Sequence, residues 1–148
     1  MVFFAPLILS FILYSFALAT FDQKPWIPKA NSGSVSSINP TVSISANWGH
    51  GGNVYFHFTN VDNKYVCALN FSIIVSSSQK FDEPWDVLKI GDNTYCLPTF
   101  ANIAPGKAYS YGGMTINSGT LNPLPKLVVT AVQSTDKANC YGEPEFQG

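Results

Sequence analysis

The residues best suited to acid–base chemistry in this sequence are three carboxylates in one short segment. Asp82, Glu83 and Asp86 fall within five residues, at the edge of a predicted strand and beside Pro84. A glycosidase needs two carboxylates that flank the bond between two sugars. Three carboxylates beside one turn are more typical of a solvated loop, and we prefer this interpretation.

The two histidines offer no better start for catalysis or metal binding. His50 and His57 are seven residues apart, and His57 lies on the polar face of a predicted strand. Zinc would need a third and a fourth ligand at suitable spacing, and the sequence does not supply them. It also lacks the patterns G-x-S-x-G and H-E-x-x-H and a Cys–His nucleophile arrangement. We therefore expect no enzymatic activity, no metal site and no cofactor.

A group of aromatic residues is more informative. Trp48, Trp85 and Phe100 each lie at a boundary between a predicted strand and a loop, where a β-sandwich presents side chains along a face or an end. The C–H faces of the sugars in a β-glucan are apolar. A ring that lies on such a face removes about 80 Å² of apolar surface from water, or about 2 kcal/mol. Three coplanar rings would suffice for weak to moderate binding, with Asn and Gln side chains as contacts for the hydroxyl groups.

Trp48 leaves two interpretations open. It continues the apolar alternation of residues 42, 44 and 46, which favours a core position, but the glycine-rich residues 49–52 follow it directly. It is a surface residue if the turn at Gly49 rotates the ring outwards. Trp85 is out of phase with the apolar Leu88 and Ile90, which indicates the outer face of its strand.

Short β-like segments must position these rings. Alternation and composition predict strands at 41–47, 54–59, 65–75, 85–90, 94–98, 108–113 and 126–132. Gly-Gly-Asn, Pro-Gly and Asn-Pro sequences mark turns between them, and no segment sustains a helical period. The pattern predicts an all-β protein, an antiparallel β-sandwich of the immunoglobulin-like or jelly-roll type with about seven or more short strands.

The chain divides into four parts. Residues 2–19 are apolar, uncharged and end in Ala17-Leu18-Ala19, so we expect residues 1–19 to be a secretory signal peptide rather than a transmembrane helix. Residues 20–40, rich in proline and serine, are expected to form an extended arm. The predicted sandwich covers residues 41–140, and residues 141–148 form a C-terminal tail. The expected mature protein is secreted and extracellular, with no membrane association after cleavage.

The charge balance narrows the choice of partner. The sequence has eight basic residues, all of them lysine, and nine carboxylates, for a formal net charge of −1. This balance gives no electrostatic attraction to nucleic acid or to an anionic membrane. Without arginine, the usual bidentate clamp for phosphates is also missing. Because 14% of the residues are aromatic, a neutral partner that stacks on rings is favoured, and we expect a monomer.

Two further features concern covalent chemistry. Cys67, Cys96 and Cys140 allow three pairings, each of which leaves one thiol over. A bridge between Cys67 and Cys140 would stabilise the fold by about 4 kcal/mol on the chain-entropy model. Asn70-Phe71-Ser72 is an N-glycosylation sequon. Because Asn70 lies in the middle of a predicted strand, glycosylation requires that its face of the strand be open.

The segments NWGHGGNVYFHFTN, at 47–60, and WDVLKIGDNTYCLPTFANIAPGKAYSYGG, at 85–113, resemble the two halves of carbohydrate-binding modules of family 2. The shared features are a tryptophan before a glycine-containing turn, a strand tryptophan, an aromatic residue after a short loop and an A-P-G turn leading into an aromatic strand. The related family 49 modules share the second half. With a cysteine on its long strand and a late cysteine, the chain is most similar to the small secreted cellulose-binding proteins of plant-parasitic nematodes. The resemblance spans about residues 41–140.

The resemblance implies a non-catalytic module that binds cellulose through a planar strip of three surface aromatics. By position these fall on Trp48, Trp85 and Phe100. Phenylalanine in place of the third tryptophan implies weaker or altered affinity. The N-terminal cysteine usual in the family is absent, so the resemblance implies a Cys67–Cys140 disulfide instead. Family members are usually joined to a catalytic or expansin domain, whereas here the resemblance implies a stand-alone binding protein.

The leading hypothesis is a secreted β-sandwich that adsorbs to cellulose through these three rings, with Tyr111 as a secondary contact, on or at a plant cell wall. Chitin and xylan stay open as ligands, because a planar strip suits several flat polysaccharides. In a second hypothesis the same aromatic residues bind a cell-wall or host protein. A degenerate hydrolase is a third, which the missing acid–base pair disfavours.

Overall fold

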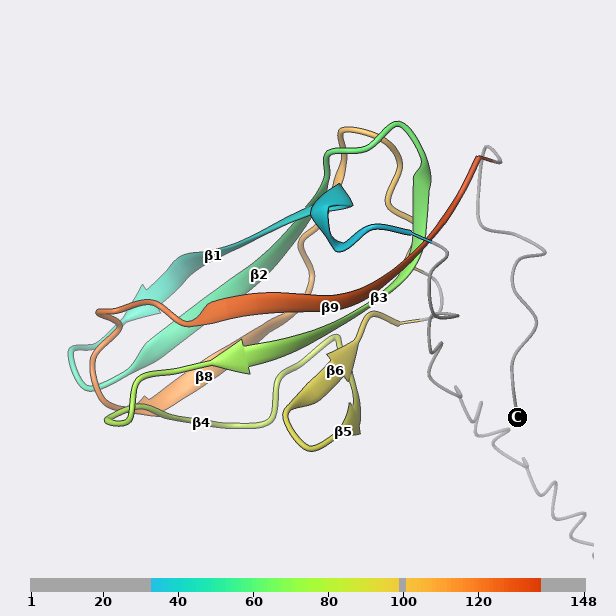
Figure 1. Ribbon diagram of the computed structural model, residues 1–148. Coiled ribbons are helices and arrows are strands. Elements are labelled where there is room, and N and C mark those ends of the chain that lie inside the picture. Colours follow the sequence, from blue (N-terminus) through green and yellow to red (C-terminus); the bar gives the residue numbers. More distant parts are fainter. Residues whose placement is uncertain (1–32, 99–100, 137–148) are drawn as a thin grey trace, which may run out of the picture.

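The structure is a computed structural model that describes residues 33–98 and 101–136. Within these residues, two antiparallel sheets pack on each other as a β-sandwich (Figure 1). Sheet A has the strand order β1-β2-β8-β4, with β7 also paired to β2, and sheet B has the order β5-β6-β3-β9. The predicted all-β antiparallel sandwich is confirmed. The expected signal peptide, most of the expected arm and the tail lie outside the described residues and stay predictions.

Four long strands form the body of the sandwich, and shorter ones border it. The bounds are β1 Ile38–Asn47, β2 Gly52–Asn60, β3 Tyr65–Ile74, β4 Lys80–Phe81, β5 Leu88–Gly91, β6 Thr94–Cys96, β7 Ala108–Tyr109, β8 Gly113–Ser118 and β9 Lys126–Thr135. A short 3-10 turn, η1 (Val35–Ser37), leads into β1.

Several strand boundaries differ from the expectation. The expected strand at 85–90 is β5 only from Leu88 onwards, so Trp85 lies before it. β1 begins at Ile38, so the end of the expected arm belongs to the sandwich. Pro40 is tolerated there because β1 is an edge strand, where a missing N–H need not interrupt a ladder on both sides. Of the expected strand at 108–113, only β7 and the first residue of β8 are strand, and the remainder of β8, as far as Ser118, was not expected. The two strands pair with different parts of β2. Three residues lie between Tyr109 of β7 and Gly113 of β8, whereas only two lie between their partners on β2, Phe58 and Tyr55.

The core lies between the sheets and follows from the alternation in β2 and β3. Val54, Phe56 and Phe58 of β2 are fully buried, and Leu69 and Phe71 of β3 face them from sheet B. The Phe71 ring lies centrally, with its centroid 4.8 Å from that of Phe58 and 6.0 Å from that of Phe56. Burial of such rings is the main favourable contribution to folding. The residues between them on β2 point to the other side of sheet A.

Two buried amide side chains fasten loops at opposite ends of the sandwich. Asn60 is fully buried and donates through Nδ2 to the carbonyl oxygens of Lys64 at 2.7 Å and Ile103 at 2.8 Å. Gln79 donates through Nε2 to two carbonyl oxygens of the β8–β9 connection, at 2.7 and 2.8 Å. These bonds satisfy backbone groups that the sheets leave unpaired, so the loops are held in place without a large core of their own.

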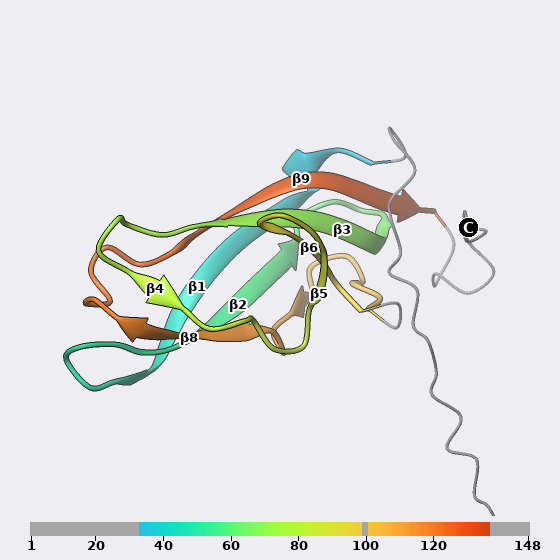
Figure 2. The same cartoon turned by 90° about the horizontal axis from the view of Figure 1, so that it is seen from below.

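The two sides of the sandwich differ. On one side, β1 of sheet A and β9 of sheet B lie close together, and a Cβ on Gly33 would lie only 2.9 Å from Ser134 Oγ of β9. On the other side, the two-residue strand β4 of sheet A faces the β5–β6 hairpin of sheet B (Figure 2). Residues from β3, β4 and this hairpin line an open groove there.

Candidate functional site

A β-bulge near the end of β1 changes the face of the residues that follow it. Ile44 pairs with the buried Val54, but the next pair in the register joins Ala46 to Asn53, so that Ser45 is an extra residue on β1. Asn53 belongs to the outward-facing residues of β2, one position out of phase with Val54. The bulge thus reverses the side of the sheet to which each of the last residues of β1 points.

Trp48 lies beyond this bulge and is a surface residue. Its exposed fraction is 53%. The apolar alternation that favoured a core position holds only as far as Ile44. We expected the chain to rotate the Trp48 ring outwards at Gly49, but the change of side occurs earlier, at the Ser45 bulge. The sequence alternates regularly there and gives no sign of a bulge.

Glycine makes room for the Trp48 ring. The Trp48 N–H donates to the Gly51 carbonyl oxygen at 3.1 Å, across a turn in which Gly49 has a φ of +87°, a value that favours glycine. A Cβ on Gly51 would lie 2.9 Å from Trp48 Nε1 and would also collide with the backbone of β8. A side chain at position 51 would therefore displace the indole, which now lies over the backbone of the turn.

Trp85 reaches the same side of sheet A by another route. Its N–H donates to the Gly113 carbonyl oxygen at 3.0 Å in an isolated antiparallel bridge. Gly113 also pairs with the outward-facing Tyr55, and a Cβ on Gly113 would lie 2.8 Å from Trp85 Cε2. The indole of Trp85 therefore covers Gly113. The Tyr55 ring meets this indole edge to face, with centroids 6.0 Å apart and planes at 89°.

Trp48, Tyr55 and Trp85 thus share the outer side of sheet A, which we call the aromatic face. Tyr55 is 40% exposed, and Trp85 is half-buried. The glycines beneath the two indoles are separated by four residues along the strand register and by one strand, or about 14 Å. Because the Tyr55 ring is perpendicular to the Trp85 indole, the two rings cannot stack on the same flat ligand. The aromatic face therefore offers two stacking surfaces, the indoles of Trp48 and Trp85, which we call the two indole stations. A ligand that contacts both indoles must be longer than a single sugar ring.

The rest of the aromatic face is mostly polar, and one carboxylate, that of Asp82, borders it through a hydrogen bond with Asn117. The two ring nitrogens of His57 lie 2.6 Å from Ser43 Oγ and 2.9 Å from Ser110 Oγ. Thr115 donates from its hydroxyl to Asn53 Oδ1 at 2.8 Å. Hydroxyl, imidazole and amide groups can bind the hydroxyls of a neutral ligand without the desolvation cost of a charge.

The row Ser43–His57–Ser110 has the spacing of a nucleophile beside a base, but its surroundings favour binding. In a serine hydrolase a carboxylate stabilises the charged imidazole, whereas here a second serine lies on the far side of His57.

Tyr111 and Phe100 complete the predicted site residues. Tyr111 is 69% exposed, borders a depression formed with residues 101–103, and meets the Tyr109 ring edge to face at 5.4 Å. The Tyr109 hydroxyl donates to the Asp86 carbonyl oxygen at 2.7 Å, and burial raises the pKa of Tyr109 to about 12. Phe100 lies outside the described residues, so the third ring of the expected strip stays a prediction.

The three carboxylates that opened the sequence analysis make separate contacts. Asp82 accepts a hydrogen bond from Asn117 Nδ2 at 2.6 Å, and Glu83 forms an ion pair with Lys89 at 3.3 Å. All three carboxylates are exposed, as a solvated loop requires. In the part of the chain that the structure describes, no group of three His, Cys, Asp or Glu side chains is placed to hold a metal ion.

Cys67, Cys96 and the sequon lie in sheet B. Cys96 is a buried free thiol, which excludes the two pairings that involve it. Cys67 is also buried and is not free. Its expected partner, Cys140, lies outside the described residues, so the Cys67–Cys140 disulfide stays a prediction. Asn70 is 9% exposed in the middle of β3, between β6 and β9, so a glycan would have to be attached before this strand is covered.

Sequence reasoning did not select Tyr55 as a site residue, although a signal was present. The strand β2 alternates strictly, and Tyr55 lies among its polar, outward-facing residues, beside His57. An aromatic residue on the polar side of an amphipathic strand is exposed unless something else covers it.

No protein-family model matches this chain, and no curated protein matches it significantly. Among residues 33–98 and 101–136, no helix is long and apolar enough to cross a membrane. The aromatic face is therefore the main structural evidence for a function.

Proposed function

We propose that this protein is a secreted, non-catalytic carbohydrate-binding protein that adsorbs to cellulose through the aromatic face. The proposal is carried by one observation. Trp48 and Tyr55, 53% and 40% exposed, share the outer side of sheet A with Trp85, among polar side chains such as Ser43, Asn53 and Thr115. Large exposed rings gathered on one face of a protein mark an interaction site.

The geometry suits a ligand with apolar faces and polar edges. Each indole that lies on a sugar face can remove about 80 Å² of apolar surface from water, which corresponds to about 2 kcal/mol. The two indole stations, about 14 Å apart, would engage different sugars of one chain or neighbouring chains of a flat surface. The side chains of Ser43, His57, Asn53 and Thr115 are available for the sugar hydroxyls.

The resemblance to family 2 modules supports cellulose as the polysaccharide and a plant cell wall as the place of action. The proposal keeps Tyr111, which is 69% exposed, and Phe100 as further contacts. The localisation follows from residues 1–19, whose composition is that of a secretory signal peptide.

A second candidate function is the binding of a cell-wall or host protein by the aromatic face. The perpendicular arrangement of Tyr55 and Trp85 favours it, because one of two perpendicular rings stands on edge. A ring on edge fits a pocket better than a flat surface, and rings anchored in pockets dominate many protein interfaces.

The first test is adsorption of the secreted protein to microcrystalline cellulose, with chitin and insoluble xylan in parallel. We expect binding to cellulose, and we expect Trp48→Ala to weaken it by about 30-fold, the equivalent of about 2 kcal/mol. Thermal stability should change little, because the Trp48 ring is exposed. Val61→Ala is the matched control: Val61 is 61% exposed in the turn after β2, and its loss should leave adsorption unchanged.

Three results would count against the proposal. Wild-type protein that stays in the supernatant with all three polysaccharides would contradict adhesion and favour a protein partner. A large drop in the melting temperature of Trp48→Ala would mean that the ring stabilises the fold. New reducing ends in a soluble glucan incubated with the protein would show that it is not a purely binding protein.

A further inference from the structure

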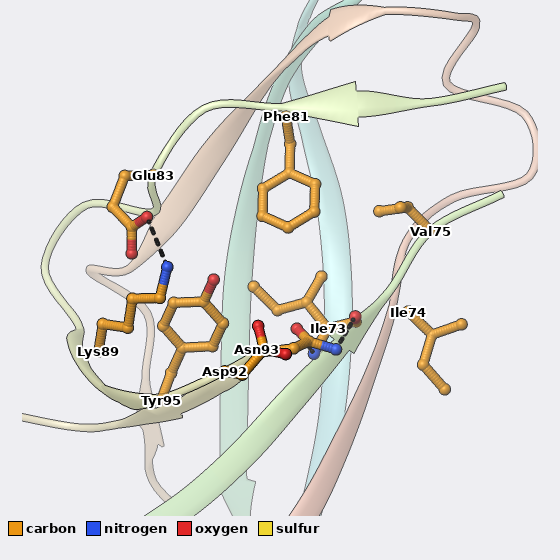
Figure 3. A pocket seen from close by; sticks show the side chains of 9 residues that line it. All are labelled: Ile73, Ile74, Val75, Phe81, Glu83, Lys89, Asp92, Asn93 and Tyr95. Atoms are coloured by element: carbon orange, nitrogen blue, oxygen red, sulfur yellow. Dashed lines mark hydrogen bonds and ion pairs between the residues drawn. The ribbon is translucent and has the colours of Figure 1, made fainter. Parts of the chain in front are cut away.

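A groove runs along the open side of the sandwich, between β4 of sheet A and the β5–β6 hairpin of sheet B (Figure 3). Its volume is about 570 Å³, within the range of pockets that hold small ligands. It is separate from the three rings of the aromatic face. Its walls are mostly apolar and its rim is polar; the lining residues are Ile73, Ile74, Val75, Phe81, Glu83, Lys89, Asp92, Asn93 and Tyr95.

The Tyr95 hydroxyl is the feature that points to a ligand. Tyr95 is only 3% exposed, and Figure 3 shows its hydroxyl directed away from the backbone of β6 into the groove, toward the side where Phe81 and the Glu83–Lys89 pair lie. Among the described residues, none forms a hydrogen bond with this hydroxyl. By contrast, the hydroxyl of the equally buried Tyr109 donates to a carbonyl oxygen at 2.7 Å. The Tyr95 hydroxyl oxygen is not one of the buried side-chain atoms that lack a partner, so it is open to solvent in the groove, where a ligand can take the place of water as its hydrogen-bond partner.

The protonation state of Tyr95 suits it to donate a hydrogen bond. Burial raises the pKa of its phenol, and the nearby Glu83 carboxylate acts in the same direction. The hydroxyl therefore keeps its proton in neutral and mildly alkaline solution. It can donate one hydrogen bond and accept others.

The rim of the groove favours a neutral ligand with hydroxyl groups. Glu83 and Lys89 form an ion pair at 3.3 Å, so their charges largely cancel, and the carboxylate of Asp92 also lines the groove. Two carboxylates against one ammonium disfavour an anionic ligand, and all three groups can form hydrogen bonds with hydroxyl groups. The rings of Phe81 and Tyr95 and the side chain of Ile73 supply apolar walls. Sugars have this combination of an apolar C–H face and a polar edge.

An added peptide strand fits the groove less well. Strand addition needs a free row of backbone groups along a sheet edge, and β4 has only two residues. The next backbone N–H, that of Asp82, already donates to the Thr115 carbonyl oxygen at 3.0 Å.

We propose that this groove binds one or two sugar units of a soluble, neutral oligosaccharide, with Tyr95 as a hydrogen-bonding partner and Phe81 as an apolar contact. The proposal rests on the proposed carbohydrate-binding function and extends it from an insoluble surface to a single glycan chain. It does not require that the aromatic face bind anything, so the two sites can be tested separately.

The experiment is calorimetric titration of the secreted protein with cellotetraose, xylotetraose and chitotetraose, each used alone. We expect one of these probes to bind, and we expect Tyr95→Phe to weaken its binding by about tenfold, as for the loss of one buried hydrogen bond. Tyr95→Phe keeps the ring and should keep the melting temperature. Tyr65→Phe is the matched control, since it removes a hydroxyl at the start of β3, outside both the groove and the aromatic face, and it should bind the probe as the wild type does.

The outcomes separate the two proposals. If Tyr95→Phe loses the soluble probe but still adsorbs to cellulose, and Trp48→Ala does the reverse, both sites are supported. If Trp48→Ala loses the soluble probe and Tyr95→Phe retains it, the groove proposal is wrong while the aromatic face stands. If none of the three tetrasaccharides binds, the groove proposal is overturned whatever the cellulose result. Binding of a soluble probe without adsorption to cellulose would support the groove and contradict the aromatic face.

Discussion

On the outer side of sheet A, Trp48 and Tyr55 are exposed, whereas on the outer side of sheet B the outward-facing Asn70, Cys96 and Gln133 are all buried. The strands of both sheets alternate in the same manner, so alternation alone gives the side on which a residue lies. It does not tell whether that side is covered. Around the middle of β3 the outer side of sheet B is thus covered, whereas the rings on the outer side of sheet A are accessible.

The polar groups on the two outer sides also differ in whether they have hydrogen-bond partners. On the aromatic face, the side chains of Ser43, His57 and Ser110 form hydrogen bonds with each other. On sheet B, the buried oxygens Asn70 Oδ1 and Gln133 Oε1 have no hydrogen-bond partner among the described residues. Because unpaired buried polar atoms are costly, changes on the outer side of sheet B should affect stability, and changes on the aromatic face should affect binding.

The largest effect should come from a buried charge on sheet B. Asn70→Asp places a carboxylate where a buried oxygen already has no donor, and we expect the free energy of unfolding at pH 7 to fall by about 3 kcal/mol or more. Asn39→Asp is the matched control on the outer side of sheet A, at an exposed position, and should change it by less than about 0.5 kcal/mol. Urea denaturation measures both.

The effect of Asn70→Asp should depend on pH in one direction. Burial disfavours the charged carboxylate, so the pKa of the introduced group is higher in the folded than in the unfolded state. The loss of stability should therefore be small near pH 3, where both states are protonated, and should grow as the pH rises. Equal losses for the two variants at pH 7 would contradict the difference between the two outer sides.

A smaller effect is expected where Trp85 covers Gly113. In Gly113→Ala the new methyl would collide with the indole and with a backbone oxygen of β2, and such overpacking costs about 1–3 kcal/mol. The displaced indole should also weaken adsorption to cellulose. Gly91→Ala is the control, because its Cβ would meet Thr94 at 3.5 Å, an ordinary contact. Denaturation and adsorption assays on both variants check this, and wild-type adsorption by Gly113→Ala would mean that the position of Trp85 does not matter for binding.

The smallest effect concerns the thiol of Cys96. Burial raises its pKa to about 11, whereas an unfolded thiol titrates near 8.5, so the unfolded state loses its proton first as the pH rises. Stability should accordingly decline above about pH 8.5, and the decline should be weaker in Cys96→Ala. The thiol should react with a maleimide only in denaturant, and mass spectrometry should then find one adduct per chain. Three adducts without a reductant would contradict the Cys67–Cys140 disulfide.

Much of the fold could be predicted because the central strands have strong patterns. The alternation of Val54, Phe56 and Phe58 identified the inner side of β2, and the apolar run of residues 65–75 identified β3. The strand β4 was missed because two residues cannot establish a period. Its pairing with β8 depends on tertiary contacts that no local pattern records.

The site was predicted less completely. The phase of Trp85 relative to Leu88 carried no information, because Trp85 bridges Gly113 of sheet A while Leu88 begins β5 of sheet B. The phase of Trp48 was misleading because of the bulge. Tyr55 was overlooked, since an aromatic residue in an alternating strand looks like an incidental surface residue until its neighbours in space are known. The contact between Tyr55 and Trp85 joins residues that are far apart in the sequence.

The extra residue at Ser45 has a consequence for variation in this surface. Because it sets which way the end of β1 turns, a change in chain length there would matter more than a change in residue type. Deletion of this one serine would restore regular alternation and turn the indole of Trp48 toward the interior, with every aromatic residue still present. In an alignment of chains that share these aromatic residues, a one-residue gap near position 45 would therefore indicate a buried indole, even where the tryptophan itself is present.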